Sequence, residues 1–160
     1  MNKVTEEKSL NRIEKRAIEA LAIAPVIKIL FEKIGKEEAL AMLKEANQEE
    51  AFQRGKDMMK SEKNNGIKEL IKDVSTWGDG GILEMEVLEE TSNTYFFNVH
   101  KCPYYEKYKE LDLTELGVGF SCCRDKSFAL GFNPKLKLIR SKTIMEGSDF
   151  CDFRYFLESE

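Results

Sequence analysis

The sequence predicts an α+β fold in which a helical N-terminal half packs on a four-stranded antiparallel sheet. Apolar residues recur every three or four positions up to Trp77, which is the period of amphipathic helices. After the glycine-rich stretch 77–81 they alternate with polar residues, which is the period of strands with one wet face. Two hairpins separated by helices then give the order ααα-ββααββ, which favours an antiparallel sheet with the helices on one side.

Length and charge limit the class of protein. We expect a single domain over residues 1–160, with a helical part over residues 1–78 and a ββααββ part over residues 79–160. The net charge of -4 predicts neither a nucleic-acid partner nor an anionic membrane surface. Residues 1–5 lack the apolar core of a secretion signal, so we expect a cytoplasmic location and reduced thiols.

The first half predicts three helices. The first takes Ser9 as its N-cap, is kinked or restarted at Pro25, and ends at Gly35. The break is expected because proline lacks the N–H group that would complete the preceding turn. The second and third helices are expected over residues 36–59 and 67–77.

The longest apolar stretch, residues 20–31, is interrupted by Pro25 and Lys28 and is too short to span a bilayer. Within it, residues 23–31 are apolar around most of a helix circumference, which is more than one packing face needs. We therefore predict no membrane partner, and a homodimer formed through the first helices.

The second half predicts two hairpins with helices between them. Proline is favoured in the first turn of a helix and threonine at an N-cap, so Pro103 and Thr114 each mark a helix start. The expected elements are strands 83–87 and 95–99, a helix from Pro103 to about Leu111, a helix 115–129, and strands 136–143 and 150–157.

Two adjacent cysteines in "SCCRD" lie on the expected helix 115–129. Residues three apart share a helix face, so Cys122 and Asp125 point the same way. Cys123 turns toward the apolar stripe of Leu116 and Phe120, and we expect it in the core. A disulfide between these neighbours would be strained.

The other two cysteines and the only histidine lie elsewhere. Cys102 precedes the helix that begins at Pro103, where unpaired backbone N–H groups stabilise a thiolate, although an unreactive cap is the simpler interpretation. Cys151 alternates with Phe153 on the apolar face of the last strand, as a core thiol does. His100 is the sole histidine, which excludes histidine triads and histidine-rich metal sites. The sequence contains no CxxC, P-loop or HExxH motif.

An ordered set of motifs in the second half is more specific than any single residue. The segments "CPYYEKYKEL", "CCRD", "GFNP", "TIMEG" and "CDFRY" resemble the L-2-amino-thiazoline-4-carboxylic acid hydrolase family, small bacterial proteins named for opening a cyclic thiazoline to an N-carbamoyl amino acid. The resemblance covers residues 99–157. The positions that match the family pattern are Cys102, Cys122, Asp125, Asn133, Pro134, Gly147, Cys151, Asp152 and Phe153.

The resemblance implies that Cys102, Cys122 and Cys151 converge with Asp125 on one pocket. Asp125 would then move a proton, and a cysteine would attack the substrate. Alternatively, the three cysteines would hold a divalent metal ion that activates water.

A substrate carboxylate would need a cationic partner. Arginine binds carboxylates through a forked pair of hydrogen bonds, and the candidates are Arg124, Arg140 and Arg154. Arg140 is the most informative of them, because it follows Leu136 and Leu138 on the apolar side of an expected strand.

Three functions are consistent with these features. The first is a hydrolase that opens a small cyclic C–N or C–S compound, such as a 2-aminothiazoline carboxylate. The second is a non-catalytic module that binds a small molecule or a metal ion through a cysteine cluster, by a fold-level analogy with the vinyl-reductase type of ligand-binding fold. The third is a structural or regulatory subunit whose cysteines only pack.

Overall fold

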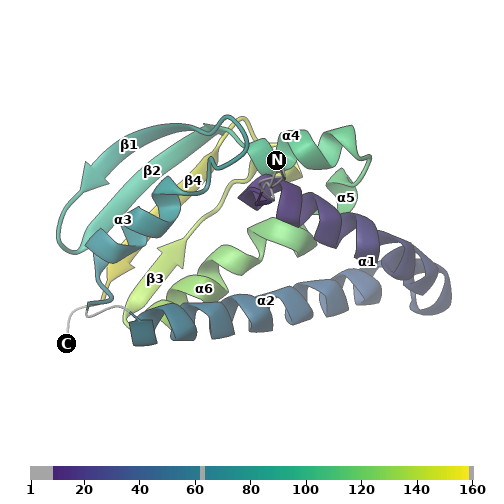
Figure 1. Cartoon of the computed structure of the whole chain (residues 1–160), viewed down its shortest axis with the longest axis horizontal. Helices are drawn as coiled ribbons and strands as arrows, with labels where there is room; N and C mark the ends of the chain where they lie inside the picture. The colour runs from purple at the N-terminus through teal and green to yellow at the C-terminus, as the bar shows by residue number, and fades with distance from the viewer. Residues whose placement is uncertain (1–8, 62–63, 159–160) are drawn as a thin grey trace, which may run out of the picture.

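The computed structural model describes residues 9–61 and 64–158, and it confirms the α+β fold: N-terminal helices accompany a four-stranded antiparallel sheet (Figure 1). The helices are α1 Arg12–Ile34, α2 Lys36–Ser61, α3 Ile67–Ser75, α4 Pro103–Glu110, α5 Thr114–Gly117 and α6 Arg124–Phe132. The strands are β1 Glu84–Glu90, β2 Thr94–Lys101, β3 Leu136–Ile139 and β4 Cys151–Leu157. The strand order is β1-β2-β4-β3.

Helix α1 is continuous through Pro25, so the helix does not restart there, and the kink expected at this residue stays a prediction. Pro25 lies on the exposed side of the helix, where water can satisfy the carbonyl that lacks its N–H partner. The N-cap is Asn11 rather than Ser9. Its side chain accepts the N–H of Glu14 at 2.8 Å, and the Glu14 carboxylate accepts the N–H of Asn11 at 2.9 Å. This reciprocal capping box fixes where the helix begins.

The alternation of apolar and polar residues correctly predicted which side chains of β2 and β4 lie on the buried face of the sheet. Phe97 and Phe153 are buried on neighbouring strands and stack with ring centroids 4.8 Å apart, and Trp77 packs edge-on against both. The expected buried face of β1 is wrong at Val87, which is 49% exposed. That strand lies at the edge of the sheet, whereas α3 packs against β2 and β4.

The single helix expected over residues 115–129 is interrupted. A π-helical turn, Val118–Cys122, separates α5 from α6, and the N–H of Cys123 donates to the carbonyl of Val118 at 2.9 Å. Gly119 lies within this turn, and a Cβ atom there would come within 2.8 Å of the Leu43 side chain. Glycine weakens an α-helix and permits this close approach, which favours the local change in winding.

The third strand is shorter than the expected 136–143, because β3 ends at Ile139. Beyond it, the carboxylate of Asp152 accepts the backbone N–H groups of Ser141 at 2.9 Å and of Lys142 at 2.5 Å. These N–H groups are satisfied by a side chain rather than by a neighbouring strand. The chain therefore leaves the sheet directly before Arg140.

Helices α2 and α6 pack with their backbones in contact. A Cβ atom on Gly55 would lie 2.4 Å from the carbonyl oxygen of Phe128, and one on Gly131 would lie 2.1 Å from that of Phe52. Because neither glycine has a side chain, α6 can lie directly on α2. This contact sets the position of the residues at the start of α6.

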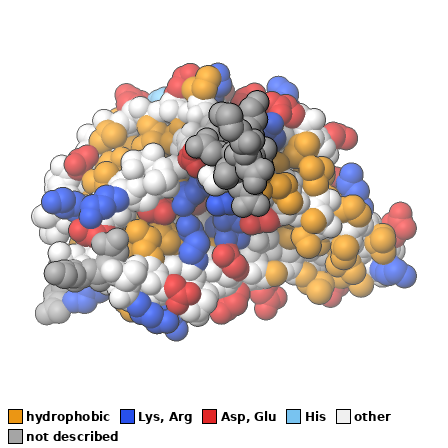
Figure 2. Space-filling model, viewed as in Figure 1, with side chains coloured by type: hydrophobic (Ala, Val, Ile, Leu, Met, Phe, Trp, Pro, Cys, Tyr) orange, Lys and Arg blue, Asp and Glu red, His pale blue; other side chains and the backbone are white. Residues whose placement is uncertain are grey.

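Two apolar clusters form the core. One joins the inner face of the sheet to α3 and α6, and the other joins α1 and α2 to α4 and α5. Helix α1 also carries exposed apolar side chains, which Figure 2 shows as an orange area along the right of the molecule. Within the described ranges, no helix is both long and apolar enough to cross a membrane.

Candidate functional site

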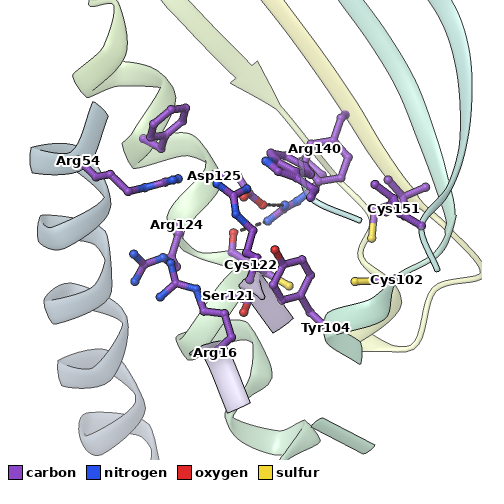
Figure 3. A pocket seen from close by; sticks show the side chains of 16 residues that line it. Arg16, Arg54, Cys102, Tyr104, Ser121, Cys122, Arg124, Asp125, Arg140 and Cys151 are labelled. Carbon is purple, nitrogen blue, oxygen red and sulfur yellow. Dashed lines mark hydrogen bonds and ion pairs between the residues drawn. The ribbon is translucent and has the colours of Figure 1, made fainter. Parts of the chain in front are cut away.

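A pocket lies between the inner face of the sheet and the helices α1, α2 and α6. The sulfur atoms of Cys102 and Cys151 lie at its sheet end, and the side chains of Arg16, Arg54 and Arg124 lie at its helical end (Figure 3). Six of the residues singled out from the sequence line it together: Cys102, Cys122, Asp125, Cys151, Arg124 and Arg140.

An ion pair between Asp125 and Arg140 occupies the middle of the pocket (Figure 3). Arg140 Nη1 donates to Asp125 Oδ2 at 2.5 Å, and its Nη2 donates to the carbonyl oxygen of Cys122 at 2.7 Å. The guanidinium also lies over the Phe153 ring, 5.0 Å from its centroid. Arg140 thus ties the end of β3 to the start of α6.

The two charges act on each other's titration. Burial raises the pKa of Asp125 above its usual range, and the attraction of Arg140 limits that rise. Burial opposes the charge on Arg140, but the charge of Asp125 outweighs it and raises the pKa of this guanidinium. The hydrogen bond from Arg140 favours the ionised form of Asp125, and burial opposes it.

The three thiols of the pocket are protonated at neutral pH. Burial raises the pKa of Cys102 to about 11, and the pKa of Cys122 well above its ordinary value. Burial also raises the pKa of Cys151, whose sulfur accepts the N–H of Ile144 at 3.2 Å. Backbone N–H groups at the start of α4 do favour the Cys102 thiolate, as expected for a helix N-terminus, but burial is the larger effect.

The π-helical turn separates Cys122 from Cys123. Cys122 is its last residue and lines the pocket, whereas Cys123 lies on the side of α2. The Cys123 thiol is half-buried and donates to the carbonyl of Gly119 at 3.2 Å, close to the carbonyl of Lys44. Packing of Cys123 in the core, as expected from an unbroken helix, is therefore wrong, because the turn redirects it toward α2.

The helical end of the pocket is strongly cationic. Arg12 and Arg16 reach it from α1, Arg54 from α2 and Arg124 from the start of α6. Figure 2 shows a group of basic side chains in blue near the centre of this face. Together with Arg140, five guanidinium groups and a single carboxylate line the pocket among the residues that the structure describes.

Sequence reasoning missed Arg12, Arg16 and Arg54. The spacing of Arg12 and Arg16 by four residues on one helix was a usable signal, because such residues share a face. Arg54 carried no local signal, since it reaches the pocket only through the packing of α2 on α6. Tyr104 and Trp77 were also missed as pocket residues.

Arg154, in contrast, does not line the pocket. Its side chain donates to the carbonyl oxygen of Phe97 at 2.8 Å and to Asn98 Oδ1 at 2.9 Å. Along β4 it alternates with the buried Phe153 and Tyr155, so it lies on the other face of the sheet. Of the three arginine candidates, Arg154 is therefore the one that the structure places outside the pocket.

The cysteines do not form a metal site. Among residues 9–61 and 64–158, no three or more His, Cys, Asp or Glu side chains are grouped so that they could hold a metal ion. The side chains present therefore do not fit the divalent metal considered from the sequence, and the chemistry of the pocket is that of its carboxylate, thiols and guanidinium groups.

Comparison with known proteins identifies a family for this arrangement. The profile of the family described as L-2-amino-thiazoline-4-carboxylic acid hydrolase matches residues 15–155. No match to a curated protein was found. Among solved structures, the chain is similar to the phenol-responsive sensory domain of the transcription activator PoxR with phenol, at 11% identity and a TM-score of 0.47, over 89% of this chain and 74% of that one.

Proposed function

The chain belongs to the L-2-amino-thiazoline-4-carboxylic acid hydrolase family, and on this premise we propose that it hydrolyses a small cyclic compound of the 2-aminothiazoline carboxylate class. The product is an N-carbamoyl amino acid with a free thiol. The observation that carries the proposal is the Asp125–Arg140 ion pair in the same pocket as the Cys122 thiol. A carboxylate and a protonated thiol supply the proton acceptor and donor that ring opening needs.

The reacting atom is the ring carbon between nitrogen and sulfur. Protonation of the ring nitrogen makes this carbon electrophilic, and the oxygen of a water molecule bonds to it. The bond from the carbon to the ring sulfur then breaks, and the sulfur leaves with the electron pair and takes up a proton. One water is consumed: its oxygen becomes the carbonyl oxygen of the carbamoyl group, one of its protons passes to Asp125, and the other is released to solvent and balances the proton taken up by the ring nitrogen.

Asp125 accepts the proton of the attacking water. Burial raises its pKa, which makes it a stronger base than an exposed aspartate, and the hydrogen bond from Arg140 favours its ionised form. Arg140 is a positioning residue: it holds the carboxylate through Nη1 and the backbone of Cys122 through Nη2. The Arg140 guanidinium thereby sets the position of the Asp125 carboxylate relative to Cys122.

Cys122 gives a proton to the departing sulfur. Its thiol is protonated at neutral pH because burial raises its pKa, so it serves as a donor rather than as a thiolate nucleophile. Asp125 then returns its proton to Cys122, and both groups regain their starting states. Cys102 and Cys151 form the apolar wall against which the substrate ring packs; in Figure 3 their sulfur atoms point toward each other.

The test is conversion of L-2-aminothiazoline-4-carboxylate to N-carbamoylcysteine, followed by mass spectrometry. We expect Asp125→Asn to lower kcat by about 10²- to 10⁴-fold, the usual contribution of a general base. Cys122→Ser is expected to lower kcat strongly, whereas Cys123→Ser, on the neighbouring residue outside the pocket, retains activity. Full activity of Asp125→Asn would refute the proposal. Binding without turnover by the wild-type protein favours the alternative function, a sensor module.

The homodimer expected from the sequence remains a prediction. Helix α1 exposes Ile18, Leu21, Val26 and Ile29 by 52%, 51%, 54% and 53%, respectively. Two copies related by a two-fold axis would present the same face to each other and cover these side chains. We expect a dimer by light scattering and a monomer for Val26→Glu; a monomeric wild-type protein at micromolar concentration contradicts this.

A further inference from the structure

The helical end of the pocket carries more positive charge than its immediate surroundings neutralise. Within residues 9–61 and 64–158, five arginines and one aspartate line the pocket, and Asp125 is already paired with Arg140. The partners of the remaining arginines do not line the cavity: Asp73 pairs with Arg12, Glu19 pairs with Arg16, and Glu50 pairs with Arg124. The pocket itself therefore presents guanidinium groups to whatever enters it.

Arg54 is the least satisfied of these groups. Its nearest carboxylate, that of Asp73, lies 3.7 Å away and also pairs with Arg12 at 3.2 Å. Its Nε atom is buried and has no hydrogen-bond partner among the residues that the structure describes. The guanidinium plane is held over the Phe128 ring, 4.4 Å from the centroid, so its position is fixed while a donor stays free.

The neighbouring guanidinium groups repel one another. Burial and then the charge of Arg16 lower the pKa of Arg124 to about 10, and Arg124 is only 5% exposed. Burial also lowers the pKa of Arg54, and Arg12 and Arg16 add to this effect. An anion placed between Arg16, Arg54 and Arg124 would relieve this repulsion and take the unused donor.

We infer that Arg16, Arg54 and Arg124 form a carboxylate subsite, which holds the acid group of the substrate and directs its ring toward Asp125 and Cys122. Figure 3 shows these three arginines on the side of the pocket opposite Cys102 and Cys151. The inference deepens the proposed function and rests on it for the identity of the ring. It assigns the recognition of the acid group to α1, α2 and the first residue of α6.

The single tryptophan of the chain provides the assay, because Trp77 lines the pocket and its fluorescence reports on an occupied cavity. The probe is L-thiazolidine-4-carboxylate, whose saturated ring lacks the amidine carbon and is not opened by the proposed reaction. Its uncharged counterpart is thiazolidine. We expect the carboxylate probe to bind at least tenfold more tightly, as for hydrogen bonds to a charged group.

Variants separate the subsite from a general charge effect. We expect Arg54→Met and Arg16→Met each to weaken binding of the carboxylate probe on the order of tenfold and to leave the binding of thiazolidine unchanged. Lys56→Met is the matched control, since it removes one positive charge from the same helix but does not line the pocket. Arg54→Lys is expected to restore part of the affinity, and thermal unfolding checks that each variant is folded.

The inference is overturned if the two probes bind with equal affinity or if neither saturates the fluorescence change. It is also overturned if Arg54→Met and Arg16→Met bind the carboxylate probe as tightly as the wild-type protein does. Tighter binding of inorganic phosphate than of the carboxylate probe overturns it as well. The proposed function fails differently. Arginine-dependent binding without hydrolysis of L-2-aminothiazoline-4-carboxylate contradicts the reaction alone. Hydrolysis with an unchanged KM in the Arg16→Met/Arg54→Met variant contradicts the subsite alone.

Discussion

Arg140 and Asp125 are joined by a hydrogen-bonded ion pair with Nη1 and Oδ2 2.5 Å apart, and they come from two elements that meet only in the folded protein. Asp125 is the second residue of α6, and Arg140 directly follows β3. The second nitrogen of the same guanidinium binds the carbonyl of Cys122 at 2.7 Å. The Arg140 side chain therefore connects the sheet to the carboxylate of Asp125 and to the backbone of Cys122.

The first prediction concerns the stability that this pair contributes. The side chains of Arg140 and Asp125 are 14% and 21% exposed, so removing one of them leaves a poorly hydrated charge. We expect Asp125→Asn and Arg140→Met each to lower the free energy of unfolding by about 2 kcal/mol.

A double-mutant cycle checks this value by urea unfolding. Because the second substitution removes a charge that is already unpaired, the double variant is expected to cost less than the sum, with an interaction energy of about 1–3 kcal/mol. Strict additivity would show that the two side chains do not stabilise each other.

The second prediction concerns alkaline pH. Burial raises the pKa of Cys102 from 9.0 to about 11, and it raises those of Cys122 and Cys151 as well. A raised pKa in the folded state means that the protein favours the protonated thiol. The stabilisation is present below the unfolded value near 9 and is lost as the pH rises toward 11. Cys102 alone is expected to account for about 2 kcal/mol.

Urea unfolding at pH 7.5 and at pH 10.5, with reductant, measures this loss. The Cys102→Ala variant is expected to lose less stability over the same interval, because it no longer has that thiol to ionise. The prediction fails if the wild-type protein and the variant show the same dependence on pH.

Periodicity predicted the order of the strands along the chain, and the family resemblance together with the search for cationic partners predicted six of the pocket residues, because these signals lie within short segments. Alternation in β4 placed Cys151 on the inner face, where it lies. The π-helical turn was not predictable from periodicity, since it depends on the approach of Leu43 to Gly119 from another helix. Its effect on Cys123 was therefore missed.

The place of Arg54 at the helical end of the pocket was also not predictable from local sequence patterns. Arg54 lies 68 residues before Cys122, and it reaches the pocket because α6 packs directly on α2 through Gly55. No local pattern reports such a contact. Arg124 and Arg154 looked equivalent as isolated arginines, and only the faces of helix and strand on which they lie distinguish them.

The third prediction concerns the glycine contact between α2 and α6. In an exposed helix, replacing glycine with alanine stabilises the helix by about 1 kcal/mol. At Gly55 and Gly131 we expect the opposite, a loss of about 1–3 kcal/mol, because each new methyl group would overlap a backbone carbonyl of the other helix. Thermal unfolding of Gly55→Ala and Gly131→Ala checks the sign, and a stabilised variant would contradict the contact.

The last prediction distinguishes the two adjacent cysteines by their environment. Cys122 lines the pocket, whereas Cys123 faces α2 and is separated from the cavity by the turn of the backbone. A ligand in the pocket is therefore expected to slow alkylation of Cys122 by iodoacetamide and to leave alkylation of Cys123 unchanged.

The measurement is peptide mass spectrometry after timed alkylation at pH 8.5, with and without L-thiazolidine-4-carboxylate. Cys102 and Cys151 line the same cavity and are expected to be protected together with Cys122. Cys123→Ala is expected to cost at most about 1 kcal/mol of stability, since its thiol is half-buried, and to leave the protection of the other three thiols intact. Equal protection of Cys122 and Cys123 would mean that the ligand acts by tightening the whole fold, because only a ligand inside the pocket can shield one neighbour and not the other.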